Sequence, residues 1–128
     1  MRKKALVVED DAETQRLLVE LLADSGCLVD IAADGDVAME MLSRTDYDVV
    51  LLDIVLPRVS GAEVMDYLEL VRPDSLAKVI VVTGLNVEEI RRLFPSVAYT
   101  LGKPVVARRL MQSVAVCLSA ADSEFTER

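Results

Sequence analysis

The chain has 128 residues, of which 52% are hydrophobic and 28% are charged, and its formal net charge is −8. This length and composition are typical of one globular domain with a hydrophobic core, and they exclude a disordered chain. An acidic surface repels phosphate backbones, so the charge argues against direct binding of nucleic acid. The chain has no histidine, which excludes histidine metal sites, Ser-His-Asp catalysis and a phosphohistidine on this chain.

Short β-branched runs alternate along the chain with segments of helical period. In chain order the pattern predicts strand 4–8, helix 11–25, strand 28–32, helix 36–44, strand 48–52, helix 61–71, strand 78–82, helix 87–94, strand 97–101 and helix 104–120. The strand at 48–52 is apolar almost throughout, as expected for a strand covered on both faces. The alternation predicts a doubly wound, flavodoxin-like α/β fold, (βα)5, with five parallel strands in the order 2-1-3-4-5.

The ends of the chain and its two cysteines favour an ordinary domain of the cytoplasm. Residues 1–121 are predicted to form the domain, and residues 122–128 a polar tail or the start of a linker. The first apolar run, residues 5–8, is too short for a signal peptide or a membrane span, so we expect no membrane association. Cys27 and Cys117 stand apart among apolar residues and are predicted to be buried free thiols.

Polar side chains follow four of the five predicted strands. Glu9 and Asp10 follow the first strand, Asp53 the third and Thr83 the fourth, and Lys103 lies just beyond the fifth. Ligands of open parallel sheets bind outside the carboxyl ends of the strands, so we expect these side chains to lie close together. Neighbouring carboxylates repel unless a cation bridges them. Oxygen ligands without Cys or His favour Mg²⁺, with Mn²⁺ as the alternative.

Such a cluster suits the transfer of a phosphoryl group to a carboxylate. Asp53 would attack phosphorus in line, and Mg²⁺, Lys103 and Thr83 would stabilise the charge on the equatorial oxygens. Each residue by itself also has an ordinary interpretation. Asp10 and Asp53 could cap a helix or a turn, Thr83 could belong to a turn, and Lys103 could be a surface lysine. Only their joint placement at one sheet edge favours a site.

Four short motifs in this order resemble the receiver domains of bacterial two-component response regulators. The resemblance covers roughly residues 3–120. Its motifs are VVEDD at 7–11, LLDIVLP at 51–57 followed by Gly61, VVTG at 81–84, and Lys103-Pro104. It implies a phosphoacceptor domain that is not a turnover enzyme but assists its own phosphorylation and dephosphorylation. The donor would be a phosphohistidine on a sensor histidine kinase or a histidine phosphotransfer protein.

The resemblance also implies a role for each residue of the cluster. Asp53 would be phosphorylated and would bind Mg²⁺ together with Asp10 and the backbone carbonyl of Val55, whereas Glu9 would act largely through water. Thr83 would be the hydroxyl that turns toward the phosphoryl group.

The resemblance assigns the remaining roles to the end of the chain and to its partners. Lys103 would pair with the phosphoryl group, and Pro104 would follow a cis peptide bond. Phosphorylation would switch a surface that binds an unknown downstream protein, with a weak homodimer as a further partner. The helix at 11–25 is where the kinases of the family dock.

The chain departs from the family at three places near the expected output surface. The position three before the lysine, usually aromatic, is Thr100, with Tyr99 beside it. The stretch from Thr83 to Lys103 is slightly short, and Val105 replaces the common Phe. These departures affect the usual rotamer coupling and the surface formed by helix 4, strand 5 and helix 5.

The residues two beyond Asp53 and Thr83 are Val55 and Leu85, and both are apolar. Both would flank the path of a water that attacks the acyl phosphate, and neither can orient it. We therefore expect slow loss of the phosphoryl group.

One alternative is a receiver domain that signals by binding alone, without phosphorylation. A domain of that kind has no need for the acids, the hydroxyl and the lysine together, and this chain has all of them.

Two other classes place acidic residues or ligands at the same sheet edge. A phosphatase of the haloacid-dehalogenase type needs a second acid two residues after its nucleophile, where this chain has Val55. A flavodoxin-like electron carrier needs a Ser/Thr-rich loop after the first strand, where the acids Glu9 and Asp10 would repel the FMN phosphate.

Overall fold

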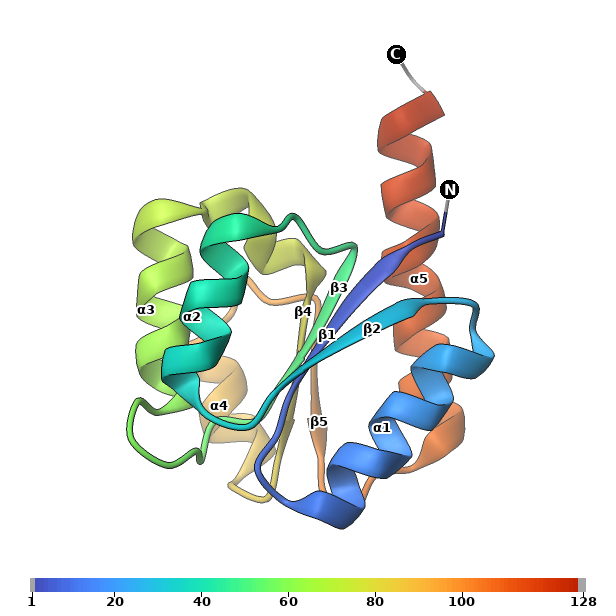
Figure 1. Cartoon of the computed structure of the whole chain (residues 1–128). Helices are drawn as coiled ribbons and strands as arrows, with labels where there is room; N and C mark the ends of the chain where they lie inside the picture. The colour runs from blue at the N-terminus through green and yellow to red at the C-terminus, as the bar shows by residue number, and fades with distance from the viewer. Residues whose placement is uncertain (1, 127–128) are drawn as a thin grey trace.

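Five parallel strands form one sheet in the order β2-β1-β3-β4-β5, as the sequence predicts. The computed structural model describes the backbone of residues 2–126 and the side chains of residues 2–120. The strands are β1 (Lys4–Val8), β2 (Leu28–Ala32), β3 (Val49–Leu52), β4 (Val79–Thr83) and β5 (Tyr99–Gly102). The predicted (βα)5 class is confirmed, and the switch in strand order lies between β1 and β3 (Figure 1).

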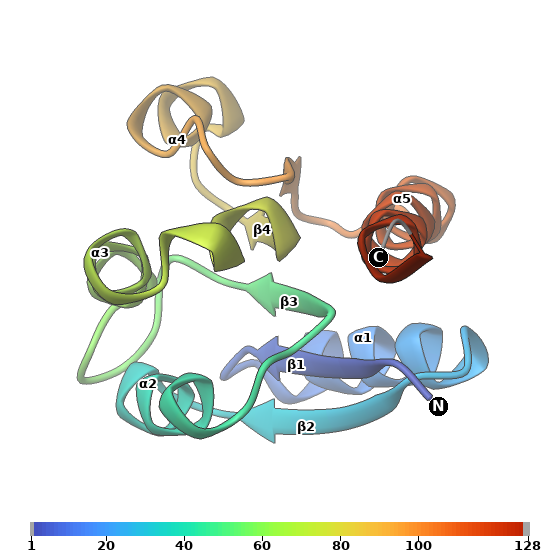
Figure 2. The same cartoon turned by 90° about the horizontal axis from the view of Figure 1, so that it is seen from above.

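Helices cover both faces of the sheet (Figure 2). One face carries α1 (Ala12–Asp24) and α5 (Ala107–Thr126). The other carries α2 (Gly35–Arg44), α3 (Gly61–Val71) and α4 (Val87–Leu93), with the 3₁₀ helix η1 (Pro73–Lys78) between α3 and β4. No helix within the described part of the chain is long and apolar enough to cross a membrane.

The inner strands β1, β3 and β4 are apolar at every position except Lys4 and Thr83 at their ends, because they supply two cores. In β1, Leu6 and Val8 pack with α2, α3 and α4, whereas Ala5 and Val7 pack with α1 and α5. The strands β3 and β4 alternate in the same way. Because successive strand residues point to opposite faces, a sheet covered on both sides buries all of them.

Local hydrogen bonds place the starts of the helices as the sequence suggests. The Asp11 carboxylate caps α1 by accepting from Thr14 N at 3.0 Å. Ser60 and Glu63 form a capping box at the start of α3. At the other end of α1, Gly26 takes φ +86°, a conformation that favours glycine after a helix.

The last two elements differ from their predicted bounds. β5 begins at Tyr99 rather than residue 97, because its register follows β4, with Ile80 opposite Tyr99. α5 begins at Ala107, so the prediction of Pro104 in its first turn is wrong. Val106 lies within the predicted helix 104–120, but it precedes the observed helix and is 53% exposed.

The helix α5 also continues to Thr126, beyond the end predicted at residue 120. The sequence after residue 120 turns polar and loses the apolar period from which the helix was predicted. Residues 127–128, part of the predicted tail, lie outside the described residues. The domain boundary at residue 121 stays a prediction.

The predicted burial of Cys27 and Cys117 is confirmed, and both thiols lie in the core under α1 and α5. Burial raises the pKa of both thiols, which keeps them protonated at neutral pH. Both cysteines therefore act as small apolar side chains.

Tyr47 is buried and forms a hydrogen bond to Asp30 of β2, and this contact can be tested through its effect on stability. Its ring is 5% exposed, and its hydroxyl donates to Asp30 Oδ2 at 2.7 Å. Burial, followed by the bond to Asp30, raises the pKa of Tyr47 from 10.0 to about 12. The raised pKa gives stability that is present below pH 10 and is lost as the pH rises toward 12.

We expect the protein to lose on the order of 1–2 kcal/mol of unfolding free energy across this window through Tyr47. Urea unfolding between pH 9 and 12 measures the loss, and Tyr47→Phe should remove this part of it. Tyr67→Phe, at a partly buried tyrosine packed on the same core, is the matched control. An identical pH dependence in the Tyr47→Phe variant would contradict the assignment.

Candidate phosphoacceptor and metal site

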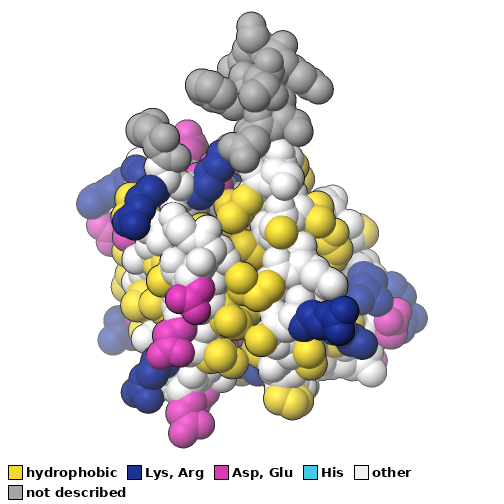
Figure 3. Space-filling view, turned by 90° about the vertical axis from the view of Figure 1, so that its right-hand side faces the viewer, with side chains coloured by type: hydrophobic (Ala, Val, Ile, Leu, Met, Phe, Trp, Pro, Cys, Tyr) yellow, Lys and Arg dark blue, Asp and Glu magenta, His cyan; other side chains and the backbone are white. Residues whose placement is uncertain are grey.

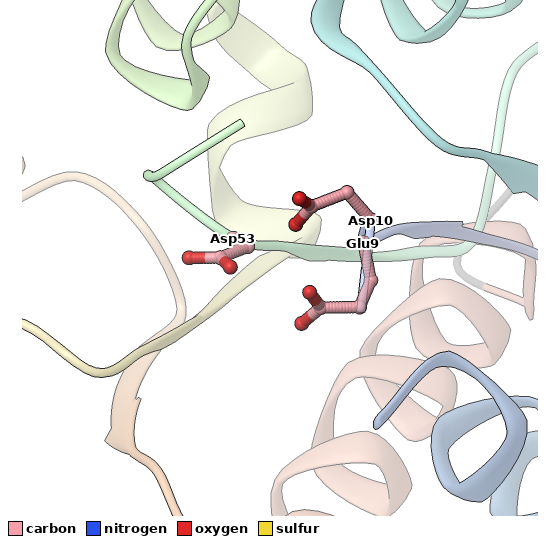
Figure 4. A group of neighbouring side chains, drawn as sticks. All are labelled: Glu9, Asp10 and Asp53. Atoms are coloured by element: carbon pink, nitrogen blue, oxygen red, sulfur yellow. The ribbon is translucent and has the colours of Figure 1, made fainter. Parts of the chain in front are cut away.

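The pairing of β1 with β3 brings three carboxylates to one edge of the sheet. Val8 lies opposite Leu52, and one residue later Asp53 N donates to Val8 O at 3.0 Å. Glu9 and Asp10 therefore leave β1 beside the point where Asp53 leaves β3 (Figure 4). An oxygen from each of the three side chains lies within 4.8 Å of the other two.

Burial divides the three acids into two kinds. Glu9 is fully buried, Asp53 is 5% exposed, and Asp10 is exposed. A glutamate at the end of a strand is usually solvated, but Glu9 is not. A buried carboxylate needs a partner of opposite charge or several hydrogen bonds.

Lys103 is that partner for both buried acids. Its Nζ lies 2.9 Å from Asp53 Oδ2 and 2.8 Å from Glu9 Oε1. The backbone places it there, since Lys103 N donates to Thr83 O at 2.8 Å and extends the β4–β5 ladder by one residue. The Lys103–Pro104 peptide bond is cis, as the resemblance implies.

Burial and neighbouring charges shift the pKa values of Glu9 and Lys103. Burial raises the pKa of Glu9, and the hydrogen bond to Lys103 and the Asp11 amide oppose this only in part. Burial also disfavours the ammonium of Lys103, but the hydrogen bonds and charges of Glu9 and Asp53 outweigh it and raise the Lys103 pKa. Lys103 therefore stays charged at neutral pH.

Thr83 and Val55 lie at the rim of the same edge. Thr83 is fully buried at the end of β4, and its Oγ1 accepts from Leu85 N at 3.1 Å. Asp53 Oδ1 accepts from Val55 N at 3.1 Å, and the Val55 side chain is 57% exposed. The side chain of Leu85 is 45% exposed. Val55 and Leu85, the two apolar residues noted in the sequence, therefore face solvent at this edge of the sheet.

Gly61 and Gln15 hold the site in place through contacts that were not predicted from the sequence. Gly61 N donates to Ile54 O at 2.8 Å, and a Cβ on Gly61 would lie 2.1 Å from Asp53 O. The start of α3 is thus packed directly on the backbone of Asp53. Gln15 of α1 donates to Glu9 O at 2.9 Å. The motif contained Gly61, but no sequence signal marked Gln15.

Comparison with known proteins gives one consistent result. The model of the response regulator receiver domain matches residues 5–115. The chain is 47% identical over 62 residues to the transcriptional regulatory protein DltR of Streptococcus agalactiae, a match that covers 48% of this chain and 28% of DltR. It is 32% identical over 111 residues to a response regulator receiver protein of Anaeromyxobacter sp., covering 85% and 46% of the two chains. The chain therefore spans less than half the length of these two relatives.

Solved structures agree on the fold. A CheY-like receiver domain protein from Methanospirillum hungatei superposes with a TM-score of 0.83 at 27% identity, covering 97% of this chain and 99% of that one. The receiver domain of the sensor histidine kinase PA1611 from Pseudomonas aeruginosa, which has magnesium in its active-site cleft, gives a TM-score of 0.80 at 23% identity, covering 93% and 99%. Receiver domains are signalling domains of two-component systems. From the family match over residues 5–115 and the fold, this chain belongs to the response regulator receiver domain family.

Proposed function

We propose that the domain accepts a phosphoryl group on Asp53 from a phosphohistidine of a partner protein. The observation that carries the proposal is the position of Lys103, whose single ammonium contacts both Glu9 and Asp53 at 2.8 and 2.9 Å. An interaction-only domain gains nothing from burying two carboxylates on one lysine. Burying charged groups costs free energy, and such a cost is expected at a site where a reaction uses the charges.

The donor set fits a divalent metal. The cluster of Glu9, Asp10 and Asp53 offers only oxygen, and its three charges exceed the one charge of Lys103. Hard oxygen ligands with excess negative charge suit Mg²⁺ or Mn²⁺. We propose that Asp10, Asp53 and the Val55 carbonyl would bind the ion directly and that Glu9 would act through water. When bound, the ion would neutralise charge on the phosphoryl oxygens.

In the proposed reaction, a carboxylate oxygen of Asp53 forms a bond to phosphorus as the bond from phosphorus to the histidine nitrogen of the partner breaks. The electron pair of that bond stays on the imidazole. Lys103 holds the Asp53 carboxylate in place beforehand and lies within reach of the phosphoryl oxygens afterwards. Thr83 would exchange its bond to the Leu85 amide for one to the phosphoryl group.

The partners follow from this reaction. The donor would be a sensor histidine kinase or a histidine phosphotransfer protein in the cytoplasm, and phosphorylation would alter binding of a downstream protein. The similar proteins include DltR, named as a transcriptional regulator, and a receiver of a sensor kinase, so the downstream partner stays open.

A small phosphodonor tests the proposal without the kinase. The protein is incubated with acetyl phosphate and MgCl₂, and intact mass followed by peptide mapping locates any added phosphoryl group. We expect one group on Asp53, none with EDTA, and none in Asp53→Asn. Asp66→Asn, at an exposed carboxylate of α3, is the control and should be phosphorylated normally. No uptake in the unaltered protein, or uptake that persists in Asp53→Asn, would overturn the proposal.

The apolar rim predicts a long-lived acyl phosphate. Val55 and Leu85 cannot orient an attacking water, so we expect Val55→Asn and Leu85→Gln to speed hydrolysis by about tenfold or less each. Loss of the phosphoryl group is followed by intact mass after removal of the donor. Val71→Asn, at an exposed valine of α3 away from the site, should leave the rate unchanged. Equal rates in all four proteins would contradict the role of the rim.

A further inference from the structure

The turn between β2 and α2 supplies no side chain to the proposed site, yet it touches the backbone of the segments that carry the acids. Its first contact is at the end of β2, where Glu9 N donates to Ala32 O at 3.1 Å. This bond extends the parallel ladder by one residue beyond the pair of Val8 and Ala32. The end of β2 is therefore tied to the segment that carries Glu9 and Asp10.

The start of α2 is held by its own cap, just after this tie. Val37 N donates to the Asp34 carboxylate at 2.9 Å, and Ala38 N donates to Asp34 O at 3.1 Å. Gly35, the first residue of the helix, is buried. Its position is thus fixed from both sides, by the end of β2 and by the first turn of α2.

The second contact of the turn is between Gly35 and Val59, which precedes α3 beside α2 (Figure 2). A Cβ on Gly35 would lie 2.7 Å from Val59 C and 2.8 Å from Val59 Cβ, and it would be closer still to Val59 O. Gly35 does not have a positive φ, so its backbone conformation suits any residue. The close contact alone therefore requires glycine at this position.

Val59 belongs to the loop of residues 53–60, whose conformation its own sequence does not favour. Arg58 has φ +63°, a value that is unfavourable for a residue with a Cβ and that persists only where the surroundings hold it. The loop is also closed at its base, since Gly61 N donates to Ile54 O at 2.8 Å. A displacement of Val59 cannot be absorbed at the base and would spread through the loop.

We propose that Gly35 is a positioning residue of the metal site, because its contact with Val59 sets the distance of the Val55 carbonyl from Asp10. This proposal rests on the proposed metal site, to which Gly35 itself gives no ligand. Mg²⁺ demands nearly ideal octahedral geometry, whereas Ca²⁺ is larger and accepts irregular geometry. A contact that fixes the spacing of two ligands therefore governs the preference for Mg²⁺ over Ca²⁺ more than the affinity for cations in general.

The contact lies apart from the face that carries α1 and α5. Figure 3 shows that face, along the middle of which apolar side chains gather. Gly35 begins α2 and Val59 packs on the core beneath α2 and α3, in the other helix layer (Figure 2). A substitution at Gly35 therefore changes ion binding without changing a side chain of the α1–α5 face.

The test compares Gly35→Ala with the unaltered protein, without a phosphodonor. Amide chemical shifts are recorded first in EDTA and then during titration with MgCl₂ or CaCl₂. In EDTA we expect Gly35→Ala to shift the amides of Val55 and Val59, because the added Cβ displaces the loop. We expect its affinity for Mg²⁺ to fall by about tenfold or more and its affinity for Ca²⁺ by about threefold or less.

A second substitution in α2 separates positioning from loss of stability. Leu42 is 3% exposed in the core beneath α2. Leu42→Ala leaves a cavity and should lower the free energy of unfolding, which urea unfolding measures for both variants. Its ratio of Mg²⁺ to Ca²⁺ affinity should equal that of the unaltered protein.

Two substitutions of Asp34 keep the proposal testable even if Gly35→Ala does not fold, since neither adds an atom at the contact. Asp34→Ala removes the cap and should lower the ratio of Mg²⁺ to Ca²⁺ affinity by about twofold. Asp34→Asn removes the same charge but keeps an oxygen that accepts from Val37 N, so it should leave the ratio unchanged.

The outcomes distinguish this proposal from the proposed function. An unchanged ratio in Gly35→Ala, an equal change in Leu42→Ala, or equal changes in the two Asp34 variants would overturn the positioning role of Gly35. Phosphorylation of Asp53 would stand in each of these cases. Absence of Mg²⁺ binding by the unaltered protein would overturn both the positioning role and the proposed metal site.

Discussion

In the absence of metal at neutral pH, replacing Lys103 with methionine is expected to lower the free energy of unfolding by about 3 kcal/mol. The substitution keeps most of the volume but removes the cation that contacts Glu9 and Asp53. Two buried carboxylates would then repel without compensation. Lys103→Met should also abolish phosphorylation by acetyl phosphate, because the group proposed to hold Asp53 and the phosphoryl oxygens is gone.

The pH and metal dependence separate this cause from simple loss of packing. The pKa of Glu9 is already raised by burial, and without Lys103 it should rise further. A carboxyl group with a raised pKa in the folded state contributes stability that is present below its unfolded pKa of 4.5 and is lost as the pH rises through the folded value. The variant should therefore recover stability relative to the unaltered protein on acidification, and MgCl₂ should restore part of it at neutral pH.

Urea unfolding in EDTA and in MgCl₂ between pH 4 and 8 measures both effects. Lys78→Met, at a partly buried lysine of η1 away from the acids, is the control and should show neither. A similar loss in both variants, or a loss in Lys103→Met that does not change with pH, would show that the Lys103 contacts do not carry the effect.

Replacing Gly61 with alanine is expected to destabilise the protein by about 2–3 kcal/mol and to slow phosphorylation of Asp53. The added Cβ would lie 2.1 Å from Asp53 O and 2.5 Å from Ile54 Cα, and backbone atoms cannot move aside as a flexible side chain can. Overpacking of this kind costs about 1–3 kcal/mol. The strand end would shift, and Asp53 with it.

Gly84→Ala is the matched control, because a Cβ at Gly84 has no atom within 4 Å. Urea unfolding and the rate of phosphoryl uptake are measured for both variants. We expect the control to keep the stability of the unaltered protein. If Gly61→Ala is equally stable and phosphorylated at an unchanged rate, the close contact does not constrain the site.

The sequence determined by itself the parts of this protein that depend on local pattern. The apolar runs of β1, β3 and β4 have to be buried on both faces, and that requirement leads to a parallel sheet between two layers of helices. The helix α3 was predicted with its observed bounds, and Pro73 follows its end. The structure adds that Ser60 and Glu63 cap its start. Strand ends that carry acids, a hydroxyl and a lysine were enough to predict where Glu9, Asp10 and Asp53 would meet.

Other features of the protein depend on contacts between residues that are distant in sequence, and only the tertiary structure decided them. The bounds of β5 follow from its register with β4, and its short, weakly apolar sequence does not fix them. The full burial of Glu9, the two contacts of Lys103 and the contact of Gly61 with Asp53 arise where separate elements converge, and no local pattern encodes such distances.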